Sequence, residues 1–350
     1  MGNRAKTGFC AAVIPCAAVL IRQLADPAAR RSFWRYWGAD VAMGAGSYAL
    51  HYSLRLLPFA ACSAVGGILG VLVGWLRGSW RADAPPRAVF AQLRPESAGK
   101  QALDHAMMRM CANVGRVYAE YNILDLLWAG GRITVSGSEH LAACQERAQP
   151  ILVFGVHLAS WEVIGAALLG LGYDVYTLYR PARNRFQDRI VVAVRTGARV
   201  KKSGAKMIPP GPAGARQAYR VLVERRGVFL TWADARRQGR APVPAFGRPM
   251  EQHGNLSAVL RLARVTGARP IPAYVERQTG ARFRTTFGPP VELIRGGDEK
   301  AVLLANLRNV DELLESIIVP RLDQWWMLGR TLDNPNLAAE IARDPAGGHA

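Results

Sequence analysis

Short apolar runs alternate with segments of helical periodicity from residue 150 onward, and this alternation is the feature that most constrains the fold. The run 151–156 (I-L-V-F-G-V) is continuous and uncharged, which is typical of a strand buried on both faces of a sheet. Strands that alternate with helices favour a parallel sheet with helices on both faces. We therefore expect an α/β fold with a central mixed, largely parallel β-sheet flanked by helices. Strands are expected at 132–137, 151–156, 173–179, 227–233, 268–275, 283–287 and 291–293, and helices at 162–171, 187–197, 213–225, 257–266 and 299–319.

Two uncharged runs precede this α/β body. The first, 7–21, is shorter than a membrane span and favours an interfacial or anchoring helix, with a buried helix as the alternative. The second, 56–76, is long enough to span a membrane. Its proline and glycines also allow it to dip into one leaflet or to pack on the soluble part of the chain. The aromatic run 33–37 (F-W-R-Y-W) suits the level of the lipid headgroups.

The proline pair at 85–86 separates these runs from the rest of the chain. Residues 85–128 have the spacing of two helices, and Glu120 lies on an apolar stripe there. A buried carboxylate needs a partner, and arginine is expected. The expected organisation is a membrane-associating helical region over 1–84, an α/β domain over 85–335 and a flexible tail over 336–350.

The chain carries a large positive charge. Its 350 residues include 45 Lys and Arg against 26 Asp and Glu, a formal net charge of +19. Such a charge attracts anions, so the candidate partners are nucleic acid, an anionic bilayer or an acidic soluble protein. Nine basic residues lie between Arg180 and Lys206 with one acid, Asp188, among them. This imbalance favours a phosphate-binding surface over an ordinary solvated face.

Composition and spacing exclude several classes of protein. Half of the residues are apolar and a fifth are charged, which excludes a disordered tail and a polytopic membrane protein. The five cysteines show no C-x-x-C spacing, which favours a reducing compartment over a disulfide scaffold. The histidines do not lie at zinc-ligand spacing, so we expect no metal site.

The most specific local feature is a histidine directly after the apolar run, in I-L-V-F-G-V-H-L-A-S-W-E (151–162). His157 leaves the carboxyl end of a strand, where open α/β sheets bind their ligands. On one continuous helix Glu162 would point about 140° away from it. A short loop followed by a helix capped by Ser160 would instead let Glu162 accept from one imidazole nitrogen and leave the other as a base. The alternative is a strand-end histidine whose hydrogen bonds have no catalytic role.

Two further sets of residues are weaker candidates. Asp234 ends the strand F-L-T-W-A-D (229–234), either as a site residue or as a helix cap. The tryptophans are expected in the core or at the membrane interface rather than as substrate platforms. They are Trp161, Trp232, Trp325 and Trp326.

The segment G-V-H-L-A-S-W-E (155–162) resembles the H-x4-D/E motif of the lipid A biosynthesis acyltransferases, the lauroyl/myristoyl transferase family. Further segments fall in the family's order over about 45–335, and this ordered series makes the resemblance specific. They are R-P-E (94–96), N-V-G-R-V-Y-A-E (113–120), V-S-G-S-E-H-L (135–141), Y-R-P-A-R-N-R (179–185), R-T-G-A-R (195–199), V-F-L-T-W-A-D (228–234), F-G-R-P (246–249), L-A-R-V-T-G-A-R-P-I-P (262–272) and Q-W-W-M-L-G-R (324–330). The chain departs from the family at Ala235, where Gln is usual, and at Ala245, where Phe is usual.

The resemblance implies a glycerolipid-acyltransferase-like fold and an enzyme of the bacterial inner membrane that faces the cytoplasm. Such an enzyme transfers a fatty acyl group from acyl carrier protein to a hydroxyl of a lipid A precursor, and needs no metal or prosthetic group. On that expectation His157 is the general base, Glu162 orients it, and Arg195 stabilises the oxyanion or a lipid phosphate. The residues expected to bind substrate are Arg180, Arg183, Arg189 and Asp234.

Three alternatives to this function follow from the same residues. The first is the same chemistry on another acceptor, such as an ornithine lipid, a glycolipid, a polyene or a lysophospholipid. The second is a nucleic-acid-binding protein. The net charge allows this function, but the chain has no known nucleic-acid-binding module, and aromatic residues do not alternate with the basic ones in the basic run. The third is an inactive relative that serves as a membrane scaffold.

Overall fold

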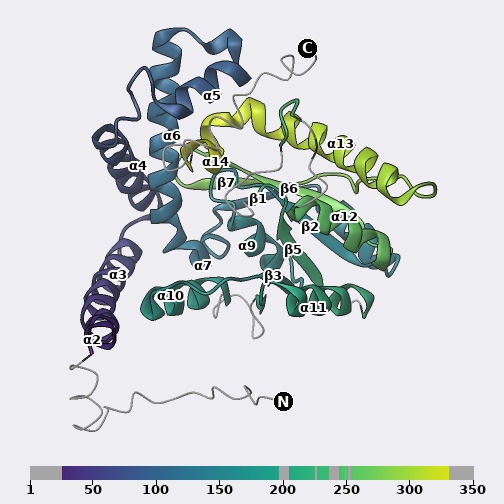
Figure 1. Ribbon diagram of the computed structural model, residues 1–350, viewed down its shortest axis with the longest axis horizontal. Coiled ribbons are helices and arrows are strands. Elements are labelled where there is room, and N and C mark those ends of the chain that lie inside the picture. Colours follow the sequence, from purple (N-terminus) through teal and green to yellow (C-terminus); the bar gives the residue numbers. More distant parts are fainter. Residues whose placement is uncertain are drawn as a thin grey trace.

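A seven-stranded sheet lies at the centre of the computed structural model, which describes residues 26–196, 205–224, 227–235, 244–248, 250 and 254–330 (Figure 1). The strand order is β1-β7-β6-β2-β5-β3-β4, and neighbouring strands are parallel except for the antiparallel pair β6 and β7. The expected mixed, largely parallel sheet is therefore confirmed. Its strands are β1 (Ile133–Ser136), β2 (Ile151–Gly155), β3 (Val175–Leu178), β4 (Lys206–Ile208), β5 (Val228–Trp232), β6 (Arg269–Gln278) and β7 (Arg282–Phe287).

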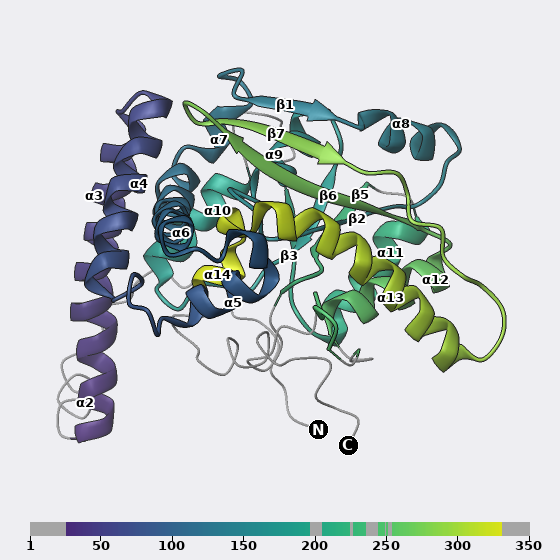
Figure 2. The same ribbon diagram turned by 90° about the horizontal axis from the view of Figure 1, so that it is seen from above.

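Helices cover both faces of the sheet, as the uncharged central strands require. Alternate residues of β2 point to opposite faces, so Leu152 and Phe154 join one apolar core while Ile151 and Val153 join the other. The first core is covered by α11, α12 and α13 and the second by α8, α9 and α10 (Figure 2). These helices are α8 (Ser138–Glu146), α9 (Val163–Gly170), α10 (Arg185–Thr196), α11 (Pro212–Val223), α12 (Asn255–Thr266) and α13 (Glu299–Ile318).

A second group of helices lies along one side of the α/β body (Figure 2). The chain runs almost without a break through α2 and α3 and then turns back through α4 to α6. The side chain of Asp26 caps the first of these helices by accepting from the amides of Ala28 and Ala29. The group comprises α2 (Pro27–Trp34), the π-helical η1 (Arg35–Ala39), α3 (Asp40–Arg55), α4 (Phe59–Leu76), α5 (Pro85–Leu93), η2 (Pro95–Ser97), α6 (Lys100–Tyr121) and α7 (Leu124–Leu127).

Helix α4 packs closely along α6 through a stripe of glycines. Gly66, Gly70 and Gly74 recur every four residues, so they lie on one face of the helix. A Cβ atom at Gly70 would lie 2.2 Å from the carbonyl oxygen of Cys111, which only a glycine permits. Packing on the rest of the chain, one of the alternatives expected for 56–76, is thus observed, and insertion of this helix into a bilayer stays a prediction.

The opposite face of α4 is apolar and exposed. Ile68, Leu72 and Trp75 are 69, 50 and 65% exposed. Among the described residues, α4 is the one helix that is long and apolar enough to cross a membrane, judged by length and composition alone. An exposed apolar face of this size marks a surface for lipid or for a partner.

Several expected elements differ from the structure. Residues 291–293 are not a strand, because the two prolines before them lack amide donors, and only the amide of Val291 bonds to the sheet, at Pro270. The region 85–128 holds three α-helices rather than two. Strand β4 was not expected, since its three residues give too short a pattern, and α8 was not expected either. The expected helix 7–21 and the tail 336–350 lie outside the described residues.

Candidate active site

His157 and Asp234 leave neighbouring parallel strands at the same edge of the sheet. The register of β2 and β5 places Gly155 opposite Trp232, and both strands end there. His157 follows Gly155 by two residues, and Asp234 follows Trp232 by two residues. The register therefore brings the two side chains together, and the expected position of His157 at the carboxyl end of a buried strand is confirmed.

The Asp234 carboxylate is completely buried and accepts hydrogen bonds from three N–H groups. The donors are the imidazole Nδ1 of His157 at 2.7 Å, the backbone amide of His157 at 3.0 Å, and the indole Nε1 of Trp325 at 2.9 Å. A carboxylate accepts at both of its oxygens, so this geometry suits the tautomer of the neutral imidazole in which Nδ1 carries the proton and Nε2 holds the lone pair. Asp234 was expected to bind substrate, but in the structure it has no exposed surface and its carboxylate is bonded to His157 and Trp325, so its substrate-binding role stays a prediction without a contact to support it.

Glu162 does not orient His157. Its carboxylate binds the guanidinium of Arg195, so the expected pairing with the imidazole is wrong. The reason is local, because α9 begins at Val163 and the Ser160 hydroxyl donates to Glu120 instead of capping the helix. The intervening turn places the ring of Trp161, rather than Glu162, against His157.

Arg195 and Glu162 form a charged pair at a small cavity of 30 Å³ between α7, α9 and α10, which His157 does not line. Burial, the largest single influence, lowers the pKa of Arg195. The charge and hydrogen bond of Glu162 and the neighbouring hydroxyls of Tyr121 and Tyr179 together raise it by more, so its pKa lies above the ordinary value. Burial beside this pair also raises the pKa of Tyr121. The role expected for Arg195 at the oxyanion stays a prediction.

Three tryptophan rings shield the imidazole from bulk water. The His157 ring centroid lies 4.9 Å from that of Trp161 and 5.1 Å from that of Trp232. Trp326 packs in turn on Trp161, at 5.0 Å. The His157 side chain is 13% exposed. Trp325 is buried in one core, and Trp326 and Trp232 pack against the two cores, which agrees with the expected core position of these aromatics. Their place around the imidazole was not expected.

The loop that carries His157 is held by the segment between η3 (Val319–Gln324) and α14 (Trp326–Arg330). The carbonyl of His157 accepts from the amide of Trp326 at 2.9 Å, and the amide of Ala159 donates to the carbonyl of Gln324 at 3.0 Å. Ala159 has a φ of +47°, a backbone conformation that costs free energy for a residue with a Cβ atom. The conformation of the loop is therefore held by its hydrogen bonds to Gln324 and Trp326 rather than by the backbone preference of its own residues.

A buried ion pair is bonded to the same loop through the Ser160 hydroxyl. Glu120 on α6 binds Arg277 on β6 through two bonds, of 2.6 and 3.0 Å, and both side chains are almost fully buried. The guanidinium also donates to the Ser160 hydroxyl at 3.1 Å, and Ser63 on α4 donates to Glu120 at 2.6 Å. The arginine partner expected for Glu120 is confirmed. Each polar group in this network is paired, which is what burial requires.

The cations expected to bind substrate lie on the surface near the same edge of the sheet. Arg180 and Arg183 are exposed in the loop after β3, and Arg189 is exposed on α10. Asp188, the one acidic residue among these basic ones, accepts hydrogen bonds from the loop that precedes its helix. The donors are the amide of Ala182, at 2.8 Å, and the Tyr179 hydroxyl. Burial and Asp188 raise the pKa of Tyr179 to about 12. Three further basic residues of the run, Arg199, Lys201 and Lys202, lie outside the described residues.

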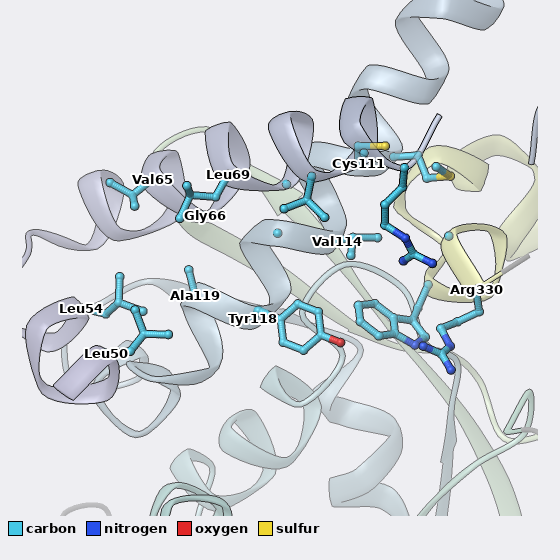
Figure 3. Close-up of a pocket in the computed structure, with 18 residues that line it drawn as sticks. Leu50, Leu54, Val65, Gly66, Leu69, Cys111, Val114, Tyr118, Ala119 and Arg330 are labelled. Atoms are coloured by element: carbon cyan, nitrogen blue, oxygen red, sulfur yellow. The ribbon is translucent and has the colours of Figure 1, made fainter. Parts of the chain in front are cut away.

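An apolar groove of 380 Å³ runs between α3, α4, α6 and α14 (Figure 3). Leu54, Val65, Leu69 and Val114 line it (Figure 3). Trp326 lines the groove as well, and its ring connects the groove to His157 through Trp161. The groove thus ends at Trp326, and the ring of Trp161 lies between Trp326 and the imidazole.

Comparison with known proteins identifies the family of the chain. The model of the bacterial lipid A biosynthesis acyltransferases matches residues 33–333, which is most of the chain. No curated protein matches the sequence. The matched segment contains both partners of the His157–Asp234 pair and the helices that form the groove. The chain therefore belongs to the bacterial lipid A biosynthesis acyltransferase family, and it is an acyltransferase.

Proposed function

We propose that this enzyme transfers a fatty acyl group from an acyl carrier protein thioester to a hydroxyl of a lipid A precursor. The observation that carries the proposal is the His157–Asp234 pair, held at the sheet edge beside an apolar groove. A thioester and an alcohol need a base to remove the hydroxyl proton and an apolar site for the chain, and we assign these roles to His157 and to the groove.

In this mechanism the Nε2 atom of His157 accepts the hydroxyl proton as the acceptor oxygen attacks the thioester carbonyl. Asp234 holds the Nδ1 proton and stabilises the imidazolium that forms. The tetrahedral intermediate then expels the carrier thiolate, which takes the proton from Nε2. The products are an ester and a free thiol, and the base returns to its starting state.

The apolar groove is proposed to hold the fatty acyl chain. Its volume lies in the range of ligand pockets, and its aromatic end at Trp326 directs a chain toward His157. Replacing Leu69 with tryptophan would fill part of the groove and shift the preferred donor toward shorter chains, measured by competition between thioesters of different length. Leu72→Trp is the matched control, because Leu72 lies on the same helix and does not line the groove. An equal shift in both variants would argue against this assignment.

The exposed cations Arg180, Arg183 and Arg189 are proposed to hold the phosphates of the acceptor or the acidic surface of the carrier. The apolar face of α4 is proposed to contact the bacterial inner membrane, with the α/β body on the cytoplasmic side where the carrier is found. Such a position places the acceptor lipid and the soluble donor on either side of the sheet edge.

The proposal is tested with membranes that contain the wild type or the His157→Ala variant, a labelled acyl carrier thioester and a panel of lipid acceptors. Transfer to the lipid A precursor by the wild type alone is the expected result. Wild-type transfer only to another lipid, such as an ornithine lipid or a lysophospholipid, would keep the mechanism and replace the acceptor. Equal activity of the two proteins would refute the role of His157.

A further inference from the structure

A second cavity, of 830 Å³, lies on the other side of the α4–α6 contact from the apolar groove. Helix α6 contributes Arg109, Asn113 and Arg116 to it, and the turn between β6 and β7 closes one end. His157 does not line this cavity, so it is separate from the site of acyl transfer. Unlike the groove, it combines an apolar wall with several charged side chains.

The positive charges that line this cavity are not balanced. Arg109 binds Asp323 at 2.5 Å, and Arg277 is occupied by Glu120. Arg116 makes no hydrogen bond or ion pair with the described residues, and its Nε atom is buried without a partner. Burial and the neighbouring charge of Arg277 lower the pKa of Arg116, and the more weakly felt charge of Glu120 raises it. Because Glu120 is bonded to Arg277, Arg116 is left in a partly buried position without a bonded anion among the described residues.

The surroundings of Arg116 indicate the chemistry of the missing anion. A half-buried guanidinium beside a second guanidinium is unfavourable unless an anion joins it, and phosphate matches the guanidinium fork in shape and charge. Gln278 and Thr279 supply polar side chains to the cavity wall, whereas the Asn113 amide is already bonded to Arg277 and to the carbonyl of Gln324. Opposite them stand Ile68 and Val71, on the helix of this chain that is apolar enough to enter a membrane.

A ligand that matches both walls has a phosphate head and a hydrocarbon body. We propose that this cavity binds the phosphate of an anionic membrane phospholipid on Arg116, with the lipid chain along the outer face of α4. This cavity is distinct from the proposed acyl-transfer site. It has no lining residue in common with the apolar groove, and His157 does not line it. A bound lipid there would also fasten α4 and α6 to the bilayer next to the catalytic loop.

The test measures binding of phosphatidylglycerol to the full chain in neutral-detergent micelles, by titration and by the shift in unfolding temperature. The Arg116→Gln variant is compared with Arg308→Gln, which makes the same charge change at an exposed position on α13. Loss of a charge-assisted bidentate contact is expected to weaken binding about tenfold or more in Arg116→Gln. Arg308→Gln is expected to bind like the wild type.

The stability without lipid separates a binding site from a structural role. Because Arg116 has no described partner, Arg116→Gln without lipid is expected to unfold at the wild-type temperature or above it. An unfolding temperature below that of the wild type, or equal loss of binding in the two variants, would overturn the proposal. Inorganic phosphate at millimolar concentration is the third arm, and stabilisation by phosphate equal to that by the lipid would assign the site to a free anion and overturn the lipid assignment. His157→Ala is expected to keep full lipid binding, so failure here and failure of the proposed function are distinguishable.

Discussion

Replacing Asp234 with asparagine exchanges one carboxylate oxygen for an amide nitrogen at a group that accepts from three donors. The amide nitrogen cannot accept, so the indole of Trp325 or an N–H of His157 must face another donor. If the amide group turns its nitrogen to the imidazole, the ring adopts the other tautomer and its base nitrogen becomes protonated. Charged acceptors contribute about 1.5 to 3 kcal/mol for each hydrogen bond, so we expect a loss of about 2 to 4 kcal/mol of unfolding free energy.

In Asp234→Asn the loss of transition-state stabilisation should exceed the loss of unfolding free energy. A buried aspartate behind an imidazole base is worth about 10⁴-fold in kcat in the serine protease triad, which corresponds to about 5 kcal/mol of transition-state stabilisation. We expect Asp234→Asn to reduce kcat by about 10³- to 10⁴-fold while KM changes little, measured by single-turnover acyl transfer in membranes. Urea denaturation of the purified chain in detergent would confirm that the variant is folded under the assay conditions.

Glu162→Gln is the matched control, because it makes the same chemical change at the other carboxylate near the loop. Glu162 binds Arg195, so its loss should lower stability but reduce kcat by no more than about tenfold. The reasoning is refuted if Glu162→Gln abolishes transfer while Asp234→Asn remains active. That result would restore the pairing that the H-x4-E spacing favours.

Three other changes test the supporting structure. Glu120→Gln breaks the buried pair with Arg277 and should cost about 3 to 5 kcal/mol in a urea denaturation curve, because it leaves an uncompensated buried charge. Gly70→Ala should lower the unfolding free energy by about 1 to 3 kcal/mol, because the added methyl group separates α4 from α6. Gly46 has open space around it, so Gly46→Ala should raise the unfolding free energy slightly. Equal effects of the two substitutions would contradict the packing argument. Burial, with a contribution from a neighbouring glutamate, raises the pKa of Asp311 to about 7. The folded state therefore holds a proton that the unfolded state releases near pH 4, so this contribution to stability is present below pH 4 and is lost as the pH rises through 7. Asp311→Asn should reduce the fall in unfolding free energy between pH 5 and pH 8 by about 1 to 3 kcal/mol, and an unchanged pH profile would contradict the assignment.

Part of the site follows from local sequence alone. The uncharged run before His157 predicts a buried strand, and a parallel strand of that kind places the histidine at the ligand-binding edge of the sheet. The position of Asp234 at the end of another strand was also visible in the sequence. His157 and Asp234 each lie two residues beyond the end of their strand, and this equal offset is the signal that could have indicated their pairing. Without the strand order, however, nothing indicated that β2 and β5 are neighbours.

The partners of the charged groups depend on contacts between distant segments. Glu162 lies five residues from His157, yet it binds Arg195, and Asp234 reaches the imidazole from 77 residues away. The tryptophan that completes the carboxylate site, Trp325, comes from near the far end of the chain, and its adjacency to the histidine rests on a backbone bridge between Leu158 and Trp325. Spacing along the chain cannot specify such pairings, because each depends on how the helices after the strands turn back.

The sequence by itself determined the class of fold, the strand that presents His157, the apolar length of α4 and the resemblance to the acyltransferase family, because each is a property of a local pattern or of an ordered set of motifs. The tertiary structure alone decided which carboxylate holds the imidazole, that Arg116 has no bonded partner among the described residues, and where the apolar groove lies. These depend on strand register and on the packing of α4 against α6, where distances of a few ångströms separate a hydrogen bond from no interaction.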